Sequence, residues 1–442
     1  MKKMYFSLLF LVSFLLLEET DRRFIANGNK ILQKTSASDE KLLYPELVNR
    51  FYELNGNNLF WFAPENEKKL HRQQLLHSID TADYFGLISK LYHYAGLKSA
   101  LETDMMDTVL VRNADRLYTD AAIAVFKDIY AGYNRAPWVW YDQLSAKYAE
   151  ADNEYLLQCL LRSGTADQLK MSVDLLEPAH QEYKSLKQEL RKQKEKKSSD
   201  TVARLITSIN YYRWIHHFNF EKVIVVNLAA ARLHYYEKDS LVLDMKTVVG
   251  KSSTPTPRFA TVCDQAILYP YWYVPRSITF KEYLPKIKNN PSWLDANNMQ
   301  VIDGSGKIMD HHRLNWASFH AGYFPFIIRQ STGCDNALGI IKFNIITPYG
   351  VYLHDTNKKT VFLSASRYFS HGCIRIEKPI RLGNLLLAGK LDTTFLQSCF
   401  KEQKPIPVLL EKPVPVFAVY MPAVADTSGK IRYYRDVYKL IR

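Results

Sequence analysis

The sequence predicts an α+β protein of more than one domain, in which a helical region precedes a mainly β region. Between about residues 43 and 190, apolar residues recur at helical spacing and few stretches alternate as strands do. From Lys222 onward, short runs rich in Val, Ile, Leu and Tyr are separated by Pro, Gly, Asp and Ser, which is typical of strands and turns. The length of 442 residues allows two or three domains with sizeable cores.

Helical periodicity is clearest at residues 110–130 and at residues 166–190, the second of which is rich in Leu and Lys. We expect these helices to form a bundle that serves as a scaffold for the region that follows. The polar stretch 191–201 is too short to hold a further folded module. We therefore place a helical scaffold domain at 23–201 and a second domain at 202–442.

The β region is expected to contain strands at 223–228, 233–236, 241–249 and 342–346. Between residues 277 and 328 the strand pattern is interrupted by charged, Asn-rich and aromatic sequence. Long insertions of this kind in a compact domain are usually lids or binding loops. We therefore interpret residues 277–328 as a capping insertion.

A hairpin is expected near the end of the chain. Its two arms are Val416–Tyr420 and Ile431–Tyr434, and Asp426–Gly429 supplies the turn residues between them. We assign this hairpin to the second domain.

The first 22 residues are typical of an export signal. Lys2 and Lys3 precede fourteen largely apolar residues, which as a helix would span about 21 Å and fall short of a hydrocarbon core of about 30 Å. A basic start, a short apolar stretch and a polar continuation predict a secretory signal peptide. No Ala-x-Ala site follows closely, so a short uncleaved membrane anchor is the alternative. In both cases we expect an exported protein.

The formal net charge of +13 suits an acidic polymer as a partner. We expect no binding to nucleic acid, because the chain has neither a basic-aromatic module nor the ligand spacing of zinc fingers. The densest basic run, residues 187–197, also contains Glu189 and Glu195 and is interpreted as a solvated helix end or linker.

The chain has an odd number of cysteines, so in an exported protein at least one thiol stays unpaired. A bond between Cys263 and Cys334 is one alternative, but sequence alone does not fix its geometry. We prefer all five as thiols: Cys159, Cys263, Cys334, Cys373 and Cys399.

The most informative residues are His354, which ends a strand-like run, and Cys373, which follows Gly372 on a turn. An isolated cysteine and histidine would usually be ordinary buried residues. Here the histidine can act as a general base that takes the thiol proton and activates Cys373 as a nucleophile. Gly372 allows a tight turn, at which backbone N–H groups can serve as oxyanion donors.

Two further side chains share the faces of this site. In an extended strand Tyr352 lies on the same side as His354, and Arg375 lies on the same side as Cys373. We predict that Arg375 holds a substrate carboxylate. Tyr352 and Ser370 are further candidates for substrate binding, and His371 is expected to orient the turn.

At these residues the chain resembles the L,D-transpeptidases, which carry the YkuD-type catalytic domain of bacterial cell-wall enzymes. The family motif is a His, a spacer, and then Ser/Thr-His-Gly-Cys with an apolar residue and Arg or Asn. Here fifteen residues separate His354 from Ser370-His371-Gly372-Cys373-Ile374-Arg375. Asp355 stands where many members have Gly, but Leu-His-Asp-Thr is typical of the large YcbB-like branch.

Upstream segments extend the resemblance over roughly residues 205–442. They are Val249-Gly250-Lys251, Thr256-Pro257, Pro270 with Trp272, Val274-Pro275, Leu284-Pro285, Arg329–Gly339 and Lys342-Phe343. Asn227-Leu228-Ala229 departs from the usual Asn-Ile-Pro. In the helical region, Phe60-Trp61 and Tyr118–Ala121 resemble the branch's scaffold more loosely, and the peptidoglycan-binding module of many large members is missing.

The resemblance implies a mainly β sandwich that acts on peptidoglycan stem tetrapeptides. Cys373 would attack the carbonyl of the third residue, usually diaminopimelate, and release D-Ala. The thioester would then pass to a second stem and form a diaminopimelate–diaminopimelate cross-link. The resemblance also implies inhibition by carbapenem-type β-lactams, no cofactor, and a place in the periplasm or cell envelope, free or anchored to the inner membrane.

Other outcomes use the same residues. Water as the acceptor would make the protein an L,D-carboxypeptidase, and a protein lysine would make it an enzyme that attaches proteins to peptidoglycan.

A zinc site at His354, His371 and Cys373 is a different class of alternative, which lacks an evident fourth ligand. A catalytically inactive wall-binding protein is disfavoured because every motif residue is present. We expect no metal. His311, His312 and His320 in the insertion are open to surface or substrate-facing roles.

Overall fold

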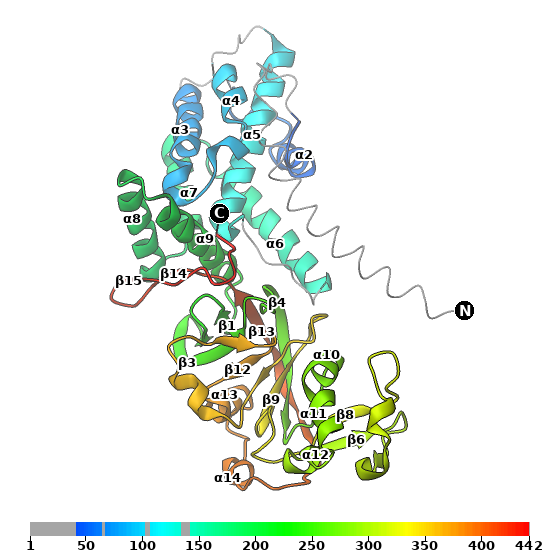
Figure 1. Ribbon diagram of the computed structural model, residues 1–442. Helices are drawn as coiled ribbons and strands as arrows, with labels where there is room; N and C mark the ends of the chain where they lie inside the picture. The colour runs from blue at the N-terminus through cyan, green and yellow to red at the C-terminus, as the bar shows by residue number, and fades with distance from the viewer. Residues whose placement is uncertain (1–40, 64–66, 102–106, 134–141, 442) are drawn as a thin grey trace, which may run out of the picture.

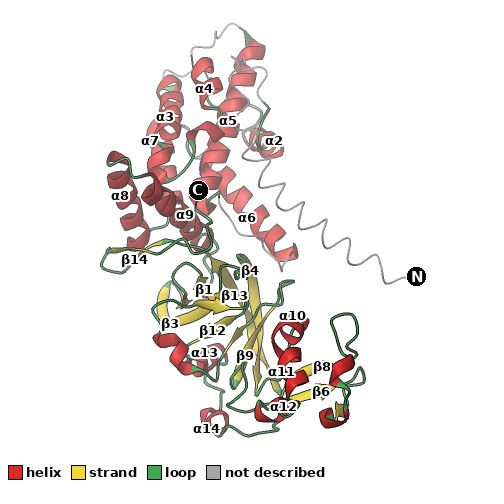
Figure 2. Cartoon of the chain, in the orientation of Figure 1, coloured by secondary structure: helices red, strands yellow, loops and turns green. Residues whose placement is uncertain are grey.

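The computed structural model describes residues 41–63, 67–101, 107–133 and 142–441. The predicted signal segment at 1–22 lies outside these residues. No helix within the described ranges combines the length and the apolar character needed to cross a membrane. The longer helices gather in one part of the molecule, and the other part contains most of the strands together with short helices (Figure 2).

The helical region begins with short helices around one long helix. Its elements are α2 (Pro45–Leu54), α3 (Lys68–Asp80), η2 (Ala82–Phe85), η3 (Ser89–Leu91), α4 (Tyr94–Ala100), α5 (Thr108–Ala131), α6 (Asp142–Leu161), α7 (Ala166–Leu176), α8 (Gln181–Glu195) and α9 (Ser199–His216). The stretch 166–190 is two helices instead of one, because Glu177 precedes Pro178 and is extended at ψ 146°.

A buried carboxylate on α5 organises the core of the helical region. Asp115 accepts hydrogen bonds from the backbone N–H groups of residues 60–62 and from the Tyr52 hydroxyl. The Trp61 indole donates to the Thr119 hydroxyl at 3.0 Å. These contacts bring together Phe60-Trp61 and Tyr118–Ala121, the two segments that carry the looser sequence resemblance.

The β region contains a nine-stranded sheet that closes on itself. Its strand order is β11-β3-β12-β10-β9-β4-β13-β1-β2, and β2 also pairs with β3. The two layers expected of a sandwich are therefore parts of one curled sheet around a single core (Figure 1). The strands are β1 (Lys222–Asn227), β2 (Arg232–Glu237), β3 (Ser240–Gly250), β4 (Phe259–Leu268), β9 (Ile341–Ile345), β10 (Leu353–His354), β11 (Tyr368–Ser370), β12 (Ile374–Ile376) and β13 (Ile406–Val419).

Helix α9 belongs to both regions. Trp214 packs edge-on against Phe417 of β13, with ring centroids 5.0 Å apart, and is part of the β-domain core. Leu205 and Ile209 of the same helix pack instead with α8. Short helices η7 (Lys359–Leu363), α13 (Pro379–Leu386) and α14 (Thr393–Gln397) complete the β domain.

The insertion folds as a small subdomain beside the main sheet (Figure 1). Its four strands pair in the order β5-β8-β6-β7 and enclose an apolar core of their own. The elements are β5 (Trp272–Tyr273), α10 (Arg276–Ile278), the π-helical turn η4 (Thr279–Tyr283), α11 (Leu284–Asn289), α12 (Trp293–Ala296), β6 (Met299–Ile302), β7 (Ile308–Met309), η5 (His311–Arg313), η6 (Trp316–Ser318) and β8 (Ile327–Gln330). We call residues 272–330 the capping subdomain.

The C-terminal hairpin differs from the prediction. Val416–Tyr420 largely continues β13 in the main sheet, and the hairpin is formed by β14 (Ala423–Ala425) and β15 (Ile431–Tyr433). Ala423 and Ala425 pack in one cluster with apolar side chains of α8 and α9. The chain therefore returns to the helical region after completing the sheet.

The preference for five thiols is wrong. Cys334, between β8 and β9, forms a disulfide with Cys399, just after α14, with 5.1 Å between their Cα atoms. Cys263 is fully buried in β4, and Cys159 and Cys373 are also free thiols. The bond connects two segments 65 residues apart that only the tertiary fold brings together.

Candidate active site

The turn that carries Cys373 is held by the Ser370 hydroxyl. That hydroxyl accepts a hydrogen bond from the Gly372 N–H at 3.1 Å and donates to the Cys373 carbonyl at 2.6 Å. Gly372 has φ +122°, a conformation that favours glycine. Thr256 supports the turn from below, since its hydroxyl donates to the Gly372 carbonyl at 2.8 Å. The Ser370 side chain is buried within this network, an arrangement that differs from the predicted substrate contact.

Four motif side chains lie on one face of the sheet. The parallel pairing of β10 with β12 sets His354 opposite Arg375, and Ile374 donates its N–H to the Tyr352 carbonyl. Tyr352, two residues before His354, therefore lies beside Cys373, two residues before Arg375. Because residues that are opposite each other share a face, the predicted base, nucleophile and carboxylate-binding residue are brought together.

Lys342 is a fifth member of this face that the sequence argument missed. It pairs with His354 from the other side, in β9, and its ammonium lies 4.2 Å from the centroid of the Tyr352 ring. Lys342 and Arg375 thus flank His354 with two cations. In β9 the apolar residues are buried and alternate with the less buried Lys342 and Asn344. This alternation indicates that Lys342 lies on the face opposite the core.

The Cys373 side chain is half-buried. Burial raises the pKa of the Cys373 thiol, while hydrogen bonding from Tyr352 and the charges of Lys342 and Arg375 oppose that rise. The thiol points toward the Gly350 carbonyl at 3.8 Å. The side chain of Trp272, from the capping subdomain, in turn hydrogen-bonds to Tyr352. Burial therefore favours the neutral thiol, and activation of Cys373 by His354 stays a prediction.

His354 is buried and neutral. Burial, together with the charge of Arg375, lowers the pKa of its imidazole to about 3. Its Nδ1 hydrogen-bonds to the Asp355 carbonyl, which leaves Nε2 as the nitrogen for proton transfer. Asp355 itself accepts from the Ile340 N–H at 3.1 Å and pairs with Lys359. The Asp of Leu-His-Asp-Thr therefore fixes the loop behind the histidine.

Arg375 has an unused donor. Its Nε is buried, and no hydrogen-bond partner for it exists in the described part of the chain. Burial lowers the pKa of this guanidinium, and the charge of Cys373 opposes the shift. A buried donor without a partner costs stability unless a ligand completes it.

The capping subdomain reaches this face through His371. Its Nε2 lies 2.8 Å from a carboxylate oxygen of Glu282 in η4, and both side chains are partly exposed. His371 thus contacts the capping subdomain, and its predicted role in orienting the turn stays a prediction. The metal-ligand clusters found among the described residues are elsewhere and do not include His354, His371 or Cys373.

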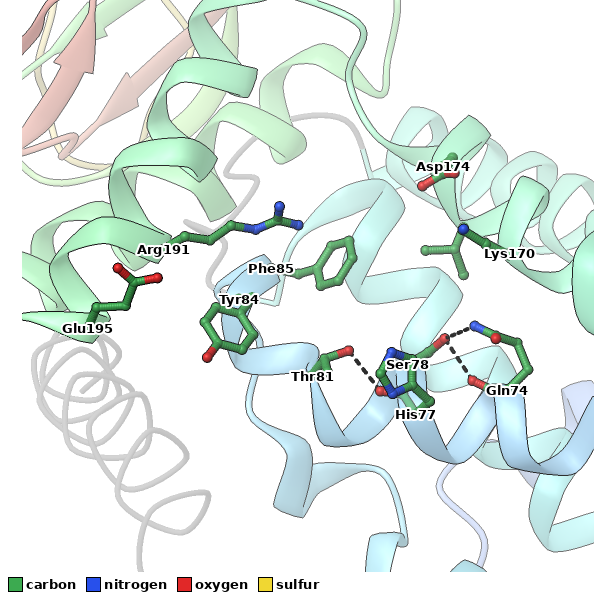
Figure 3. Close-up of a pocket in the computed structure, with 11 residues that line it drawn as sticks. Gln74, His77, Ser78, Thr81, Tyr84, Phe85, Lys170, Asp174, Arg191 and Glu195 are labelled. Atoms are coloured by element: carbon green, nitrogen blue, oxygen red, sulfur yellow. Dashed lines mark hydrogen bonds between the residues drawn. The ribbon is translucent and has the colours of Figure 1, made fainter.

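Two hollows lie away from this face. One of 430 Å³ in the helical region is surrounded by side chains of α3, η2, α7 and α8 (Figure 3). There the Ser78 hydroxyl donates to the Gln74 carbonyl at 3.0 Å, so it is not paired with a histidine base. The other, of 670 Å³, lies behind His354 and is lined by Asp355, Lys359 and the disulfide. Neither hollow contains the thiol.

Comparisons with known proteins identify two families along the chain. Residues 221–405 match the L,D-transpeptidase catalytic domain family (YkuD), and residues 46–190 match a family described as a scaffold domain. A Haemophilus influenzae protein that carries the provisional name L,D-transpeptidase is 32% identical over 225 residues. That match covers 50% of this chain and 45% of the relative, so the chain spans about half the relative's length.

Two solved structures are similar at low identity. An L,D-transpeptidase from Mycobacterium smegmatis is 14% identical, with a TM-score of 0.22, and the match covers 45% of this chain and 58% of that one. An L,D-transpeptidase in complex with imipenem is 13% identical, with a TM-score of 0.22, and the match covers 45% and 59% of the two chains. On the two family matches, residues 221–405 of this chain belong to the L,D-transpeptidase catalytic domain family and are preceded by a scaffold domain.

Proposed function

We propose that this protein is a peptidoglycan L,D-transpeptidase that forms diaminopimelate–diaminopimelate cross-links. The observation that carries the proposal is the shared face of Cys373, His354 and Arg375 beneath the capping subdomain. A nucleophile, a base and an anion-binding group at one place are what acyl transfer requires. The family match over residues 221–405 supports the same class of reaction.

Each proton has a place in the proposed reaction. As the Cys373 sulfur attacks the carbonyl of the third stem residue, His354 Nε2 takes the thiol proton. The C–N bond to D-Ala then breaks, and the imidazolium returns that proton to the leaving amine. In the second half, the acceptor amine attacks the thioester, loses its proton to His354, and the sulfur leaves as the thiol.

The charges around Cys373 are suited to this transfer. In the resting protein both partners are neutral, because burial raises the pKa of the thiol and lowers that of His354. Negative charge develops on sulfur only as the proton moves. Lys342, Arg375 and hydrogen bonding from Tyr352 then stabilise it, since each of them already opposes the rise in the thiol pKa.

Of the two backbone N–H groups at the turn, that of Cys373 is the better candidate for the oxyanion donor. The Gly372 N–H, which we first considered, is already bonded to the Ser370 hydroxyl. We therefore assign the donor role to the Cys373 N–H, beside the carbon under attack. Arg375 Nε is the donor we assign to a substrate carboxylate, because it is buried and free of a protein acceptor among the described residues.

The setting of the enzyme follows from the same proposal. Its partners are a donor tetrapeptide and an acceptor amine in the cell envelope, and residues 1–22 act as signal peptide or anchor. Carbapenems are expected to acylate Cys373, because a β-lactam presents a strained carbonyl and a carboxylate to the same groups.

The product decides between this function and its alternatives. Purified protein is incubated with a disaccharide-tetrapeptide and the products are identified by mass spectrometry. Cross-linked dimers with release of D-Ala support transpeptidation, whereas tripeptide alone shows a carboxypeptidase. Adding a lysine-containing acceptor protein tests protein attachment. If the folded protein yields neither dimers nor tripeptide, the proposal is contradicted.

A further inference from the structure

We propose that His180, His216 and Asp239 bind a divalent transition-metal ion, with zinc as the preferred occupant, and that this site links the scaffold helices to the catalytic domain. The three residues come from separate parts of the fold. His180 directly precedes α8, His216 is the last residue of α9, and Asp239 lies in the turn between β2 and β3. Figure 1 shows α8 and α9 next to the end of the β domain that carries this turn.

The separations between the ligand atoms fit an ion better than direct contact. One carboxylate oxygen of Asp239 lies 3.6 Å from His180 Nε2 and 3.7 Å from His216 Nδ1. Both distances exceed a hydrogen bond. Zinc bonds of about 2.0–2.2 Å in a tetrahedron place neighbouring ligand atoms about 3.3–3.6 Å apart. All three atoms lie within 4.8 Å of one another, so one ion can contact each of them after a small adjustment.

The two imidazoles are already held in place. His216 stacks on Tyr212, with ring centroids 4.2 Å apart and planes at 20°, and the His180 ring lies 4.2 Å from the His216 ring. The side chains of His180 and His216 are only 25% and 13% exposed. Preorganised ligands of this kind lose little entropy when an ion binds.

The turn that presents the carboxylate is conformationally costly. Lys238 and Asp239 have φ of +47° and +63°, in the left-handed region that favours glycine or asparagine. The two-residue turn between Glu237 and Ser240 requires this conformation, and it fixes the position of the Asp239 backbone. Asp239 remains 52% exposed, which gives an ion a path of entry and leaves room for water as a fourth ligand.

A second cluster provides a contrast. In the capping subdomain, His312 hydrogen-bonds to Asp295 at 3.0 Å, whereas His311 Nε2 lies 3.1 Å from the other Asp295 oxygen but has no hydrogen-bond partner among the described residues. Its carboxylate and imidazole atoms lie closer together than ligand atoms around one zinc ion, and this cluster serves here as the control.

The experiment is a zinc titration of the full chain by isothermal calorimetry, with thermal unfolding measured in parallel. Every protein carries Cys373→Ala, so that the reactive thiol does not compete for zinc. We expect one saturable site and a higher unfolding temperature with zinc. Asp239→Asn, which keeps a residue that tolerates the left-handed turn, should weaken binding at least tenfold, and His216→Ala should abolish it.

The control variant Asp295→Asn should bind zinc as the parent does. Absence of saturable binding, or binding that survives Asp239→Asn and His216→Ala but is lost in Asp295→Asn, would overturn the assignment. Circular dichroism shows whether each variant is folded. Because binding is measured without turnover, this result is independent of whether the transpeptidase proposal holds.

Discussion

Asp115 in the helical region and Arg375 in the β region are both charged side chains with buried polar atoms, but their hydrogen bonding differs. In the helical region Asp115 accepts hydrogen bonds from residues 60–62 and Tyr52. In the β region the Nε of Arg375 is buried with no partner among the described residues, and burial raises the pKa of Cys373. A fully bonded buried group maintains a fold, whereas an incompletely bonded one is available to a ligand.

The largest expected effect tests the reactive side of this comparison. Cys373→Ala should lower the rates of carbapenem acylation and of cross-linking by on the order of 10³-fold or more, because the proposed nucleophile is lost. Intact-protein mass spectrometry measures the adduct. Cys263→Ala is the matched control, since that thiol is buried in β4 and should leave acylation intact. An adduct of equal yield on Cys373→Ala would refute the assignment.

The next largest effect tests whether the hydrogen bonds of Asp115 stabilise the helical region. Asp115→Ala should lower the free energy of unfolding by about 3–5 kcal/mol, because it leaves buried backbone N–H groups without an acceptor. Urea unfolding provides the measurement, and the exposed Asp174→Ala provides the control. If both variants unfold at the parent midpoint, Asp115 does not organise the helical core.

A pH experiment compares the two regions directly, because each buries a neutral histidine. Burial lowers the pKa of His71 in α3 and of His354 in β10 to about 3. Between about pH 6.5 and 3, therefore, each imidazole is protonated in the unfolded chain but not in the folded one. Stability should fall as the pH falls through this window, by on the order of 3 kcal/mol per histidine at pH 4.

Replacing either histidine should flatten that slope. Unfolding is measured at several pH values for His71→Phe and His354→Phe. Each variant should lose only its own region's acid sensitivity, which hydrogen exchange can assign to helices or strands. A slope unchanged in both variants would show that neither histidine is buried in its neutral form.

The smallest expected effect concerns the unused donor. Arg375→Lys keeps the positive charge but loses the guanidinium Nε–H, so carbapenem acylation should slow by about tenfold. Stopped-flow measurement of acylation gives the rate. The exposed Arg381→Lys should behave as the parent does. Equal rates in both variants would exclude Arg375 as the carboxylate ligand.

Much of the fold was predictable because its signals are local. Periodicity identified α5, and alternation identified β1, β2, β3 and β9 within a few residues. Features that depend on distant segments were missed. The Cys334–Cys399 bond joins loops that meet only after folding, and ring closure through β2 and β3 has no sequence signature.

The site shows the same division. The motif supplied the identity of Cys373 and His354, and the pairing of β10 with β12 then placed Arg375 beside them. The motif did not indicate that the Ser370 hydroxyl turns inward while His371 reaches outward to Glu282. Which way a turn side chain points depends on its tertiary neighbours.

The position of β13 in the sheet has a consequence for the order of folding. Ile224 of β1 pairs with Val416 of β13, and β4 pairs with the other edge of β13. Until residues 406–419 have been synthesised, β1 and β4 have one edge each that lacks its partner. Contacts of long sequence separation form slowly, and open strand edges promote aggregation. The β half of the emerging chain therefore stays incomplete until late in synthesis, and the last support for the end of β3 arrives when the Tyr438 hydroxyl donates to the Gly250 carbonyl.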